Sequence, residues 1–131
     1  MAKKIVVADD EYYISRSLSL LLRRDGFECE IAHDGEQAVR LVKEIHPAIL
    51  FLDLDMPKKN GYEVLREVRR DPAYDDVRVI LLTAKGTTGE EELGLQLGAN
   101  LCLLKPFDPR QVVSLVRDIM AKVDVDEGCH S

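Results

Sequence analysis

A run of apolar residues that ends in an acidic residue constrains the fold of this chain more than any other feature. Residues 49–52, Ile-Leu-Phe-Leu, are uninterrupted by polar groups. Such a run is typical of a strand buried on both faces, as parallel sheets require. Asp53 follows directly, so we expect its carboxylate at the C-terminal end of the strand, the edge where open α/β sheets bind ligands. A turn-capping aspartate before Met56-Pro57 and Asn60-Gly61 would give the same local pattern.

The rest of the chain alternates between segments with strand-like and helix-like patterns. The expected strands cover residues 3–8, 27–32, 49–52, 77–83 and 101–104, and the expected helices cover residues 12–24, 35–45, 61–70, 90–97 and 109–123. Residues 71–76 are expected to form a polar loop, and the apolar residues of the expected helix over residues 90–97 are Leu93 and Leu97. Five strands and five helices in alternation predict an α/β fold with a doubly wound parallel sheet. We expect one domain over residues 1–123 and a short polar tail over residues 124–131.

Composition excludes several classes of protein. The chain has 131 residues, of which 46% are hydrophobic, which suits one globular domain and argues against disorder. The net charge of -6 predicts no direct nucleic-acid binding and no attraction to anionic membranes. No run is long enough for a signal peptide or a membrane span, so we expect a cytoplasmic location. Three cysteines without close spacing indicate neither a disulfide framework nor a zinc site.

Polar residues follow four of the five expected strands. They are Asp9 and Asp10, Asp53, Thr83, and Lys105. Because parallel strands end at one edge of the sheet, we expect these side chains to converge. Two like charges ~5 Å apart cost roughly 3 kcal/mol at an effective dielectric of about 20, so the carboxylates need a compensating cation. An all-oxygen set of ligands favours a hard ion such as Mg²⁺.

Taken together, these residues resemble the receiver domain of two-component response regulators. The resemblance rests on Asp9-Asp10, Asp53, the Asp-Met-Pro-x-x-x-Gly motif from Asp55 to Gly61, Thr83-Ala84, and Lys105-Pro106-Phe107. It covers nearly the whole chain, from Lys3 to about Val123. It implies the flavodoxin-like receiver topology with strand order 2-1-3-4-5. It also implies a signalling domain rather than an enzyme.

The resemblance implies a role for each residue at this edge. Asp53 is expected to accept a phosphoryl group from a sensor histidine kinase or a histidine phosphotransfer protein, in a reaction that depends on Mg²⁺. The metal ligands are expected to be Asp9, Asp10, Asp53 and the backbone carbonyl of Asp55. Lys105, Thr83 and the backbone N–H groups of Leu54 and Ala84 are expected to bind the phosphoryl group. The family also has a cis peptide bond at the position of Lys105-Pro106.

One residue departs from the family pattern and affects the output. The family has an aromatic residue three positions before the lysine, which moves inward together with the threonine, whereas this chain has Cys102. We interpret Cys102 as a small buried thiol. The sequence does not identify the downstream protein target, and a second copy of this chain, in a phosphorylation-dependent homodimer, is one candidate partner.

Two other classes of protein share parts of the pattern. A haloacid-dehalogenase-like phosphatase is the main alternative, because that family also places Asp-x-Asp after an apolar strand, as Asp53-Leu54-Asp55 does. That family has the dyad on its first strand and its second acidic pair late, which is the reverse of the order here. A flavodoxin-like cofactor protein needs a phosphate-binding loop after the first strand, where this chain has Asp9, Asp10 and Glu11.

Overall fold

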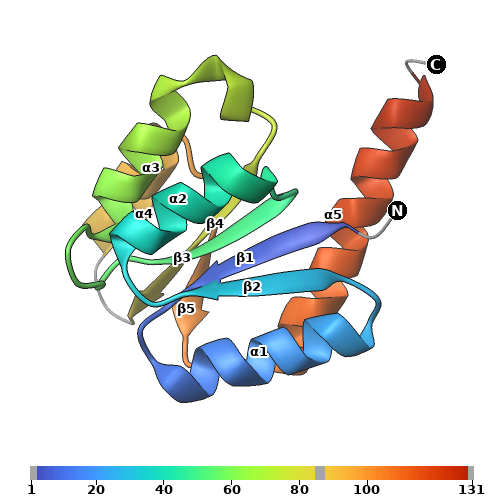
Figure 1. Ribbon diagram of the computed structural model, residues 1–131, viewed down its shortest axis with the longest axis horizontal. Coiled ribbons are helices and arrows are strands. Elements are labelled where there is room, and N and C mark those ends of the chain that lie inside the picture. Colours follow the sequence, from blue (N-terminus) through green and yellow to red (C-terminus); the bar gives the residue numbers. More distant parts are fainter. Residues whose placement is uncertain (1–2, 85–87, 130–131) are drawn as a thin grey trace.

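The computed structural model describes residues 3–84 and 88–129 and confirms the predicted α/β fold (Figure 1). Five parallel strands form one sheet in the order β2-β1-β3-β4-β5. The strands are β1 (Lys4–Ala8), β2 (Glu28–Ala32), β3 (Ile49–Asp53), β4 (Arg78–Ala84) and β5 (Leu101–Lys105). The helices are α1 (Tyr12–Arg24), α2 (Gly35–Ile45), α3 (Gly61–Arg70), the short 3-10 helix η1 (Pro72–Tyr74), α4 (Thr88–Gln96) and α5 (Pro109–Cys129).

Each face of the sheet carries its own hydrophobic core. In Figure 1, α2, α3 and α4 lie on one side of the sheet, and α1 and α5 lie on the other. β3 is central, and all five of its residues are buried. Its alternate side chains point to opposite faces, so that Leu50 and Leu52 join the core under α2 and α3, while Ile49 and Phe51 join the core under α1 and α5. The apolar run therefore forms the doubly covered strand that the sequence predicts.

Side chains that accept hydrogen bonds from free backbone amides begin three of the α-helices. Asp34 accepts the amide of Gln37 at 2.8 Å before α2, and Asp108 accepts an amide at 2.9 Å before α5. Asn60 begins α3 with a capping box, because Glu63 returns a hydrogen bond to the Asn60 amide. The loops at the C-terminal edge of the sheet thus lead into helices whose starts are well defined.

Three local features differ from the sequence-based expectation. Residues 72–74 of the expected polar loop form η1, because Asp71 accepts the amide of Ala73 and Pro72 suits the first turn. In α4, Leu93 is 37% exposed, and Gly94 is instead the residue buried against Leu81 of the sheet. The α5 backbone continues beyond Val123 to Cys129, since no helix-breaking residue precedes Gly128. Within residues 3–84 and 88–129, none of the helices has the length and apolar character needed to cross a membrane.

Candidate functional site

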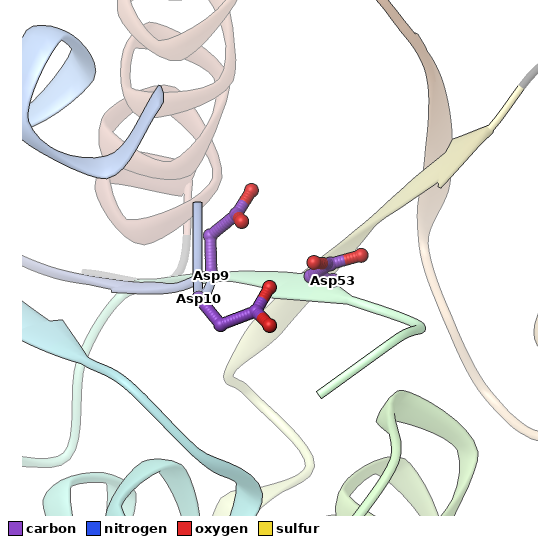
Figure 2. A group of neighbouring side chains, drawn as sticks. All are labelled: Asp9, Asp10 and Asp53. Carbon is purple, nitrogen blue, oxygen red and sulfur yellow. The ribbon is translucent and has the colours of Figure 1, made fainter. Parts of the chain in front are cut away.

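The ends of β1 and β3 bring three carboxylates together at the C-terminal edge of the sheet (Figure 2). Asp9 and Asp10 follow β1, and Asp53 is the last residue of β3. Each of the three offers one oxygen, and these oxygens all lie within 4.8 Å of one another. β1 and β3 are paired in parallel register, with Ala8 opposite Leu52, so the pairing of these strands places the acidic residues side by side.

The ammonium group of Lys105 neutralises part of this charge from the end of β5. Lys105 Nζ lies 3.0 Å from Asp9 Oδ2, 3.3 Å from Asp53 Oδ2 and 2.9 Å from Glu11 Oε1. Asp9 is fully buried and Asp53 is only 4% exposed, so these ion pairs form where water screens little. One ammonium is thus shared by three carboxylates, and the site keeps an excess of negative charge.

The surroundings change the pKa values of Asp53 and Lys105. Burial and the negative charge of Asp9 raise the pKa of Asp53 to about 7, although the amide of Asp55 and the charge of Lys105 act in the opposite direction. Burial alone would lower the pKa of Lys105, but its hydrogen bond to Glu11, its close contact with Asp9 and the charge of Asp53 raise it overall. Lys105 therefore stays protonated at neutral pH, whereas the charge of Asp53 is poorly compensated.

The site fits a hard divalent cation. Asp9 Oδ2 is buried and receives no hydrogen bond of good geometry from the described residues, although Lys105 Nζ lies 3.0 Å away. The other oxygen of Asp9 accepts the amide of Glu11 at 2.8 Å, and Asp53 Oδ1 accepts the amide of Asp55 at 3.2 Å. Because the Lys105 ammonium is shared with Asp53 and Glu11, it compensates the charge of the buried Asp9 Oδ2 only in part, which carries a cost in free energy. A cation near it and near the exposed carboxylate of Asp10 would remove that cost.

Two groups expected to bind phosphate have other partners in this structure. The Thr83 side chain is buried, and its hydroxyl lies 3.5 Å from the carbonyl oxygen of Leu103, a long and weak hydrogen bond. The amide of Leu54 donates to the carbonyl of Leu82 at 3.3 Å. Ala84 is the last residue of β4, in register with Lys105, and the Lys105–Pro106 peptide bond is cis. Thr83 and Leu54 would have to exchange weak partners to bind an anion at Asp53.

Cys102 lies on the opposite side of β5 from the core under α5. It is partly buried and packs against the core that α2, α3 and α4 cover. Its sulfur lies 4.0 Å from the carbonyl oxygen of Glu91 in α4. Burial raises the pKa of this thiol, and the charge of Glu91 adds to the effect. The neutral thiol is therefore a small packing group under α4, although it is only partly buried where the sequence analysis expects a buried thiol.

Sequence reasoning did not predict the contacts that Glu11, Gly35 and Gly61 make around the site. Glu11 follows Asp9-Asp10 directly, and this run of three acidic residues was the available signal for its contact with Lys105. A Cβ atom on Gly61 would lie 2.7 Å from the carbonyl oxygen of Asp53, so only glycine lets α3 begin this close to β3. The Gly35 amide donates to the Pro57 carbonyl at 3.2 Å, and a side chain there would collide with the backbone of Lys59. Spacing alone does not reveal such close approaches.

The curated relatives correct one expectation about partners. The chain is 39% identical over 122 residues to "Probable transcriptional regulator ycf27" of Porphyridium aerugineum, covering 93% of this chain and 50% of that protein. It is 37% identical over 124 residues to "DNA-binding response regulator MtrA" of Mycobacterium tuberculosis strain H37Rv, covering 95% and 53% respectively. The chain thus spans about half the length of the curated relatives it matches.

These names overturn our prediction that there is no direct nucleic-acid binding. That prediction used the net charge of -6 as if it described a whole protein. The matched part makes up about half of relatives that are named as DNA-binding or transcriptional regulators. The bulk charge of this part therefore does not decide whether such proteins bind DNA.

Solved structures and the family model of the receiver domain agree with the fold and identify the family. The chemotaxis response regulator CheY4 of Vibrio cholerae is 26% identical with a TM-score of 0.84, and the match covers 91% of this chain and 99% of that one. The receiver domain of response regulator 1452 from Francisella is 26% identical with a TM-score of 0.83, covering 92% and 98%. The model of the response regulator receiver domain matches residues 5–117, which include every carboxylate of the cluster and Lys105. The convergent carboxylates, the shared lysine and these matches lead to one conclusion: the chain belongs to the response regulator receiver family.

Proposed function

We propose that this chain is a phosphorylation-controlled switch in which Asp53 accepts a phosphoryl group from a histidine kinase or a histidine phosphotransfer protein. The observation that carries the proposal is the position of the Asp53 carboxylate. It ends the central strand, pairs with Lys105 Nζ at 3.3 Å and lies within 4.8 Å of the Asp9 and Asp10 oxygens. A nucleophile, a fixed cation and a place for a second cation thus meet at one point. Members of this family generally act as signalling domains, and we propose the same role for this chain instead of repeated catalytic turnover.

Asp9, Asp10, Asp53 and the backbone carbonyl of Asp55 are the proposed ligands of Mg²⁺. The bound ion would supply positive charge close to the oxygens of the incoming phosphoryl group. The buried Asp9 Oδ2 supports this assignment, since it receives no hydrogen bond of good geometry from the described residues and its neighbouring ammonium, Lys105, is shared with Asp53 and Glu11. Asp10 is exposed, which would leave its side of the ion open to water and to the phosphoryl donor.

In the proposed transfer, an oxygen of the Asp53 carboxylate attacks phosphorus while the phosphorus–nitrogen bond of the phosphohistidine breaks. The electron pair of that bond stays on the imidazole nitrogen, which can then take a proton from water. Lys105 is already within reach of Asp53 and can stabilise the negative charge of the phosphoryl oxygens without moving far. The acyl phosphate adds negative charge and new acceptor oxygens at the same position.

Those new oxygens are the proposed cause of the conformational response. Thr83 could leave its long hydrogen bond with Leu103 and donate to a phosphoryl oxygen. The amides of Leu54 and Ala84 would add further donors. Hydrogen bonds to a charged group contribute roughly 1.5–3 kcal/mol each, whereas a shift from 1:99 to 99:1 needs about 5.5 kcal/mol. We therefore expect partial activation unless a downstream partner also binds.

The test is an intact-mass measurement after incubation with Mg²⁺ and acetyl phosphate. Wild-type protein should gain one phosphoryl group, and the adduct should be absent with EDTA and in Asp53→Ala. Asp55→Asn keeps the backbone carbonyl and should keep the adduct, which makes it the matched control at the neighbouring acidic residue. No adduct on the wild type, or an equal adduct on Asp53→Ala, would contradict the proposal. Release of many equivalents of phosphate would indicate a phosphatase instead.

A further inference from the structure

We infer that the hydrogen bond from the Tyr62 hydroxyl to the Glu90 carbonyl holds α4 in its resting position, and that phosphorylation of Asp53 breaks it. The inference rests on the proposed function and names the residue that connects the site to α4. Tyr62 Oη lies 3.0 Å from the carbonyl oxygen of Glu90, 28 residues later in the chain. The two residues lie in the first turns of α3 and α4.

The backbone next to Tyr62 is hydrogen-bonded to the loop that follows Asp53, which we call the phosphoacceptor loop. Tyr62 follows Gly61, whose amide donates to the Leu54 carbonyl at 3.0 Å and where an added Cβ would lie 2.7 Å from the Asp53 carbonyl oxygen. The capping box of Asn60 and Glu63 further fixes the first turn of α3. Tyr62 is thus a side chain of defined position that reaches from the residues around Asp53 to another helix.

The two ends of α4 are held with different strength. Past its C-terminal end, Arg69 donates to the Gly98 carbonyl at 2.9 Å and to Asn100 Oδ1 at 2.9 Å. The same guanidinium also donates to the carbonyls of Tyr74 and Val77, at 3.0 and 2.8 Å, so this end is joined to α3 and to the start of β4. Tyr62 contributes a single neutral hydrogen bond to the first turn of α4. α4 can therefore turn about its C-terminal end when its first turn is released.

The first turn of α4 is also the part of the helix nearest in sequence to Thr83. Residues 84–87 join Thr83 to Thr88, the first residue of α4. Movement of Thr83 toward a phosphoryl group on Asp53 would shift the start of α4, which follows Thr83 closely in the sequence, whereas Tyr62 stays with α3. The Glu90 carbonyl and the Tyr62 hydroxyl would then separate. Because linkage is reciprocal, the hydrogen bond in turn opposes the binding of a phosphoryl group at Asp53.

The contact is chemically suited to a reversible role. Burial raises the pKa of Tyr62, and the charges of Glu90 and Asp55 add to this, so the phenol keeps its proton and can donate. The ring is partly buried against the same core as Cys102, so the hydroxyl can change partner while the ring stays packed. A net contribution typical of one neutral hydrogen bond corresponds to a change of roughly 2–10-fold in an equilibrium constant.

The test uses Mg²⁺ with beryllofluoride, a non-covalent mimic of the acyl phosphate, on the full chain. Binding is followed by calorimetry, and Tyr62→Phe, which loses only the hydroxyl, should lower the half-saturating beryllofluoride concentration roughly 2–10-fold. Tyr74→Phe is the matched control, because Tyr74 is also a partly buried tyrosine on the same core and lies in η1, away from Asp53. Its half-saturating concentration should remain within about 1.5-fold of wild type, well inside the range expected for one hydrogen bond.

A second readout follows the ring itself and does not depend on the stability of a variant. In protein labelled with 3-fluorotyrosine, the fluorine signal of Tyr62 should shift when Mg²⁺ and beryllofluoride bind, while that of Tyr74 should stay in place. The signal is assigned by its loss in Tyr62→Phe or, if that variant does not fold, by elimination with phenylalanine variants of the other three tyrosines, Tyr12, Tyr13 and Tyr74.

The possible failures are distinguishable. If wild type binds beryllofluoride but the Tyr62 signal does not move, or if Tyr62→Phe binds with unchanged affinity, the role of the hydrogen bond is refuted and the proposed function stands. If wild type binds no beryllofluoride in the presence of Mg²⁺, the proposed function fails, and the role of Tyr62 fails with it.

Discussion

The helices α3 and α4 cover the same face of the sheet but pack against it in different ways. α3 begins with a capping box and buries Val64, Leu65 and Val68. Of the α4 residues whose side chains are described, 89–96, only Gly94 is buried, and Leu93 and Leu95 are 37% and 45% exposed. The helix that fixes the phosphoacceptor loop is thus packed rigidly, whereas the helix proposed to respond rests on the sheet with little apolar contact. Regions that move are drawn from the weakly packed parts of a fold.

The largest expected effect tests this difference in packing. Leu65 is fully buried, so Leu65→Ala should reduce the free energy of unfolding by about 2–5 kcal/mol. Leu93→Ala, the same truncation on the exposed side of α4, should cost less than about 1 kcal/mol. Urea denaturation measures both variants. Equal losses would mean that α4 is packed as firmly as α3.

The next largest effect compares two glycines, one at the start of each helix. Gly61→Ala places a methyl group against the Asp53 carbonyl and should cost about 1–3 kcal/mol, with slower phosphorylation by acetyl phosphate. A methyl group added at Gly89, in the first turn of α4, would meet no atom of the described residues within 4 Å, so Gly89→Ala should be neutral or stabilise by up to about 1 kcal/mol. Thermal denaturation and the phosphorylation rate distinguish them. A tolerated alanine at position 61 would show that α3 can withdraw from β3.

A third prediction concerns the negative charge of Asp53, which lies next to the start of α3. The folded-state pKa of Asp53 is about 7, above an unfolded value near 3.9, so the folded protein binds the Asp53 proton more tightly. Its ionisation therefore lowers stability progressively from about pH 4 to pH 7. Asp53→Asn should match wild type near pH 4 and exceed it by roughly 1–3 kcal/mol at pH 8 without divalent cations, since one pKa unit corresponds to about 1.4 kcal/mol.

This prediction is checked by urea denaturation at pH 4 and pH 8 in EDTA, and again with Mg²⁺. Added Mg²⁺ should raise the stability of wild type at pH 8 more than that of Asp53→Asn, because the variant lacks one charged ligand. A stability difference between the two proteins that is independent of pH would contradict the raised pKa of Asp53.

The smallest expected effect lies on the α4 side. Cys102 packs under the loosely attached helix, so Cys102→Tyr should fold, with a change in stability below about 1.5 kcal/mol, and should still accept a phosphoryl group on Asp53. Circular dichroism and intact mass provide the measurements. Loss of folding would show that the space between β5 and α4 is too tight for a ring.

The sequence predicted the fold and the convergence of Asp9, Asp53 and Lys105 because both follow from periodicity. Once apolar runs are identified as parallel strands, the residue after each run must lie at one edge. The exposed Leu93 was missed because periodicity cannot show that Gly94 brings α4 against Leu81. The Tyr62–Glu90 hydrogen bond was also missed, since nothing local predicts which carbonyl a hydroxyl 28 residues away will reach.

The position of Lys105 also has a consequence for the folding of the chain. Its partners Asp9 and Glu11 follow the first strand, and the contact between Glu11 and Lys105 spans 94 residues of sequence. Contacts this distant in sequence form only when the intervening chain is in place, and they carry a high cost in loop closure. A chain that is still incomplete or only partly folded therefore lacks the cation beside Asp53. The proposed transfer to Asp53 is thus restricted to molecules in which β5 has joined the sheet.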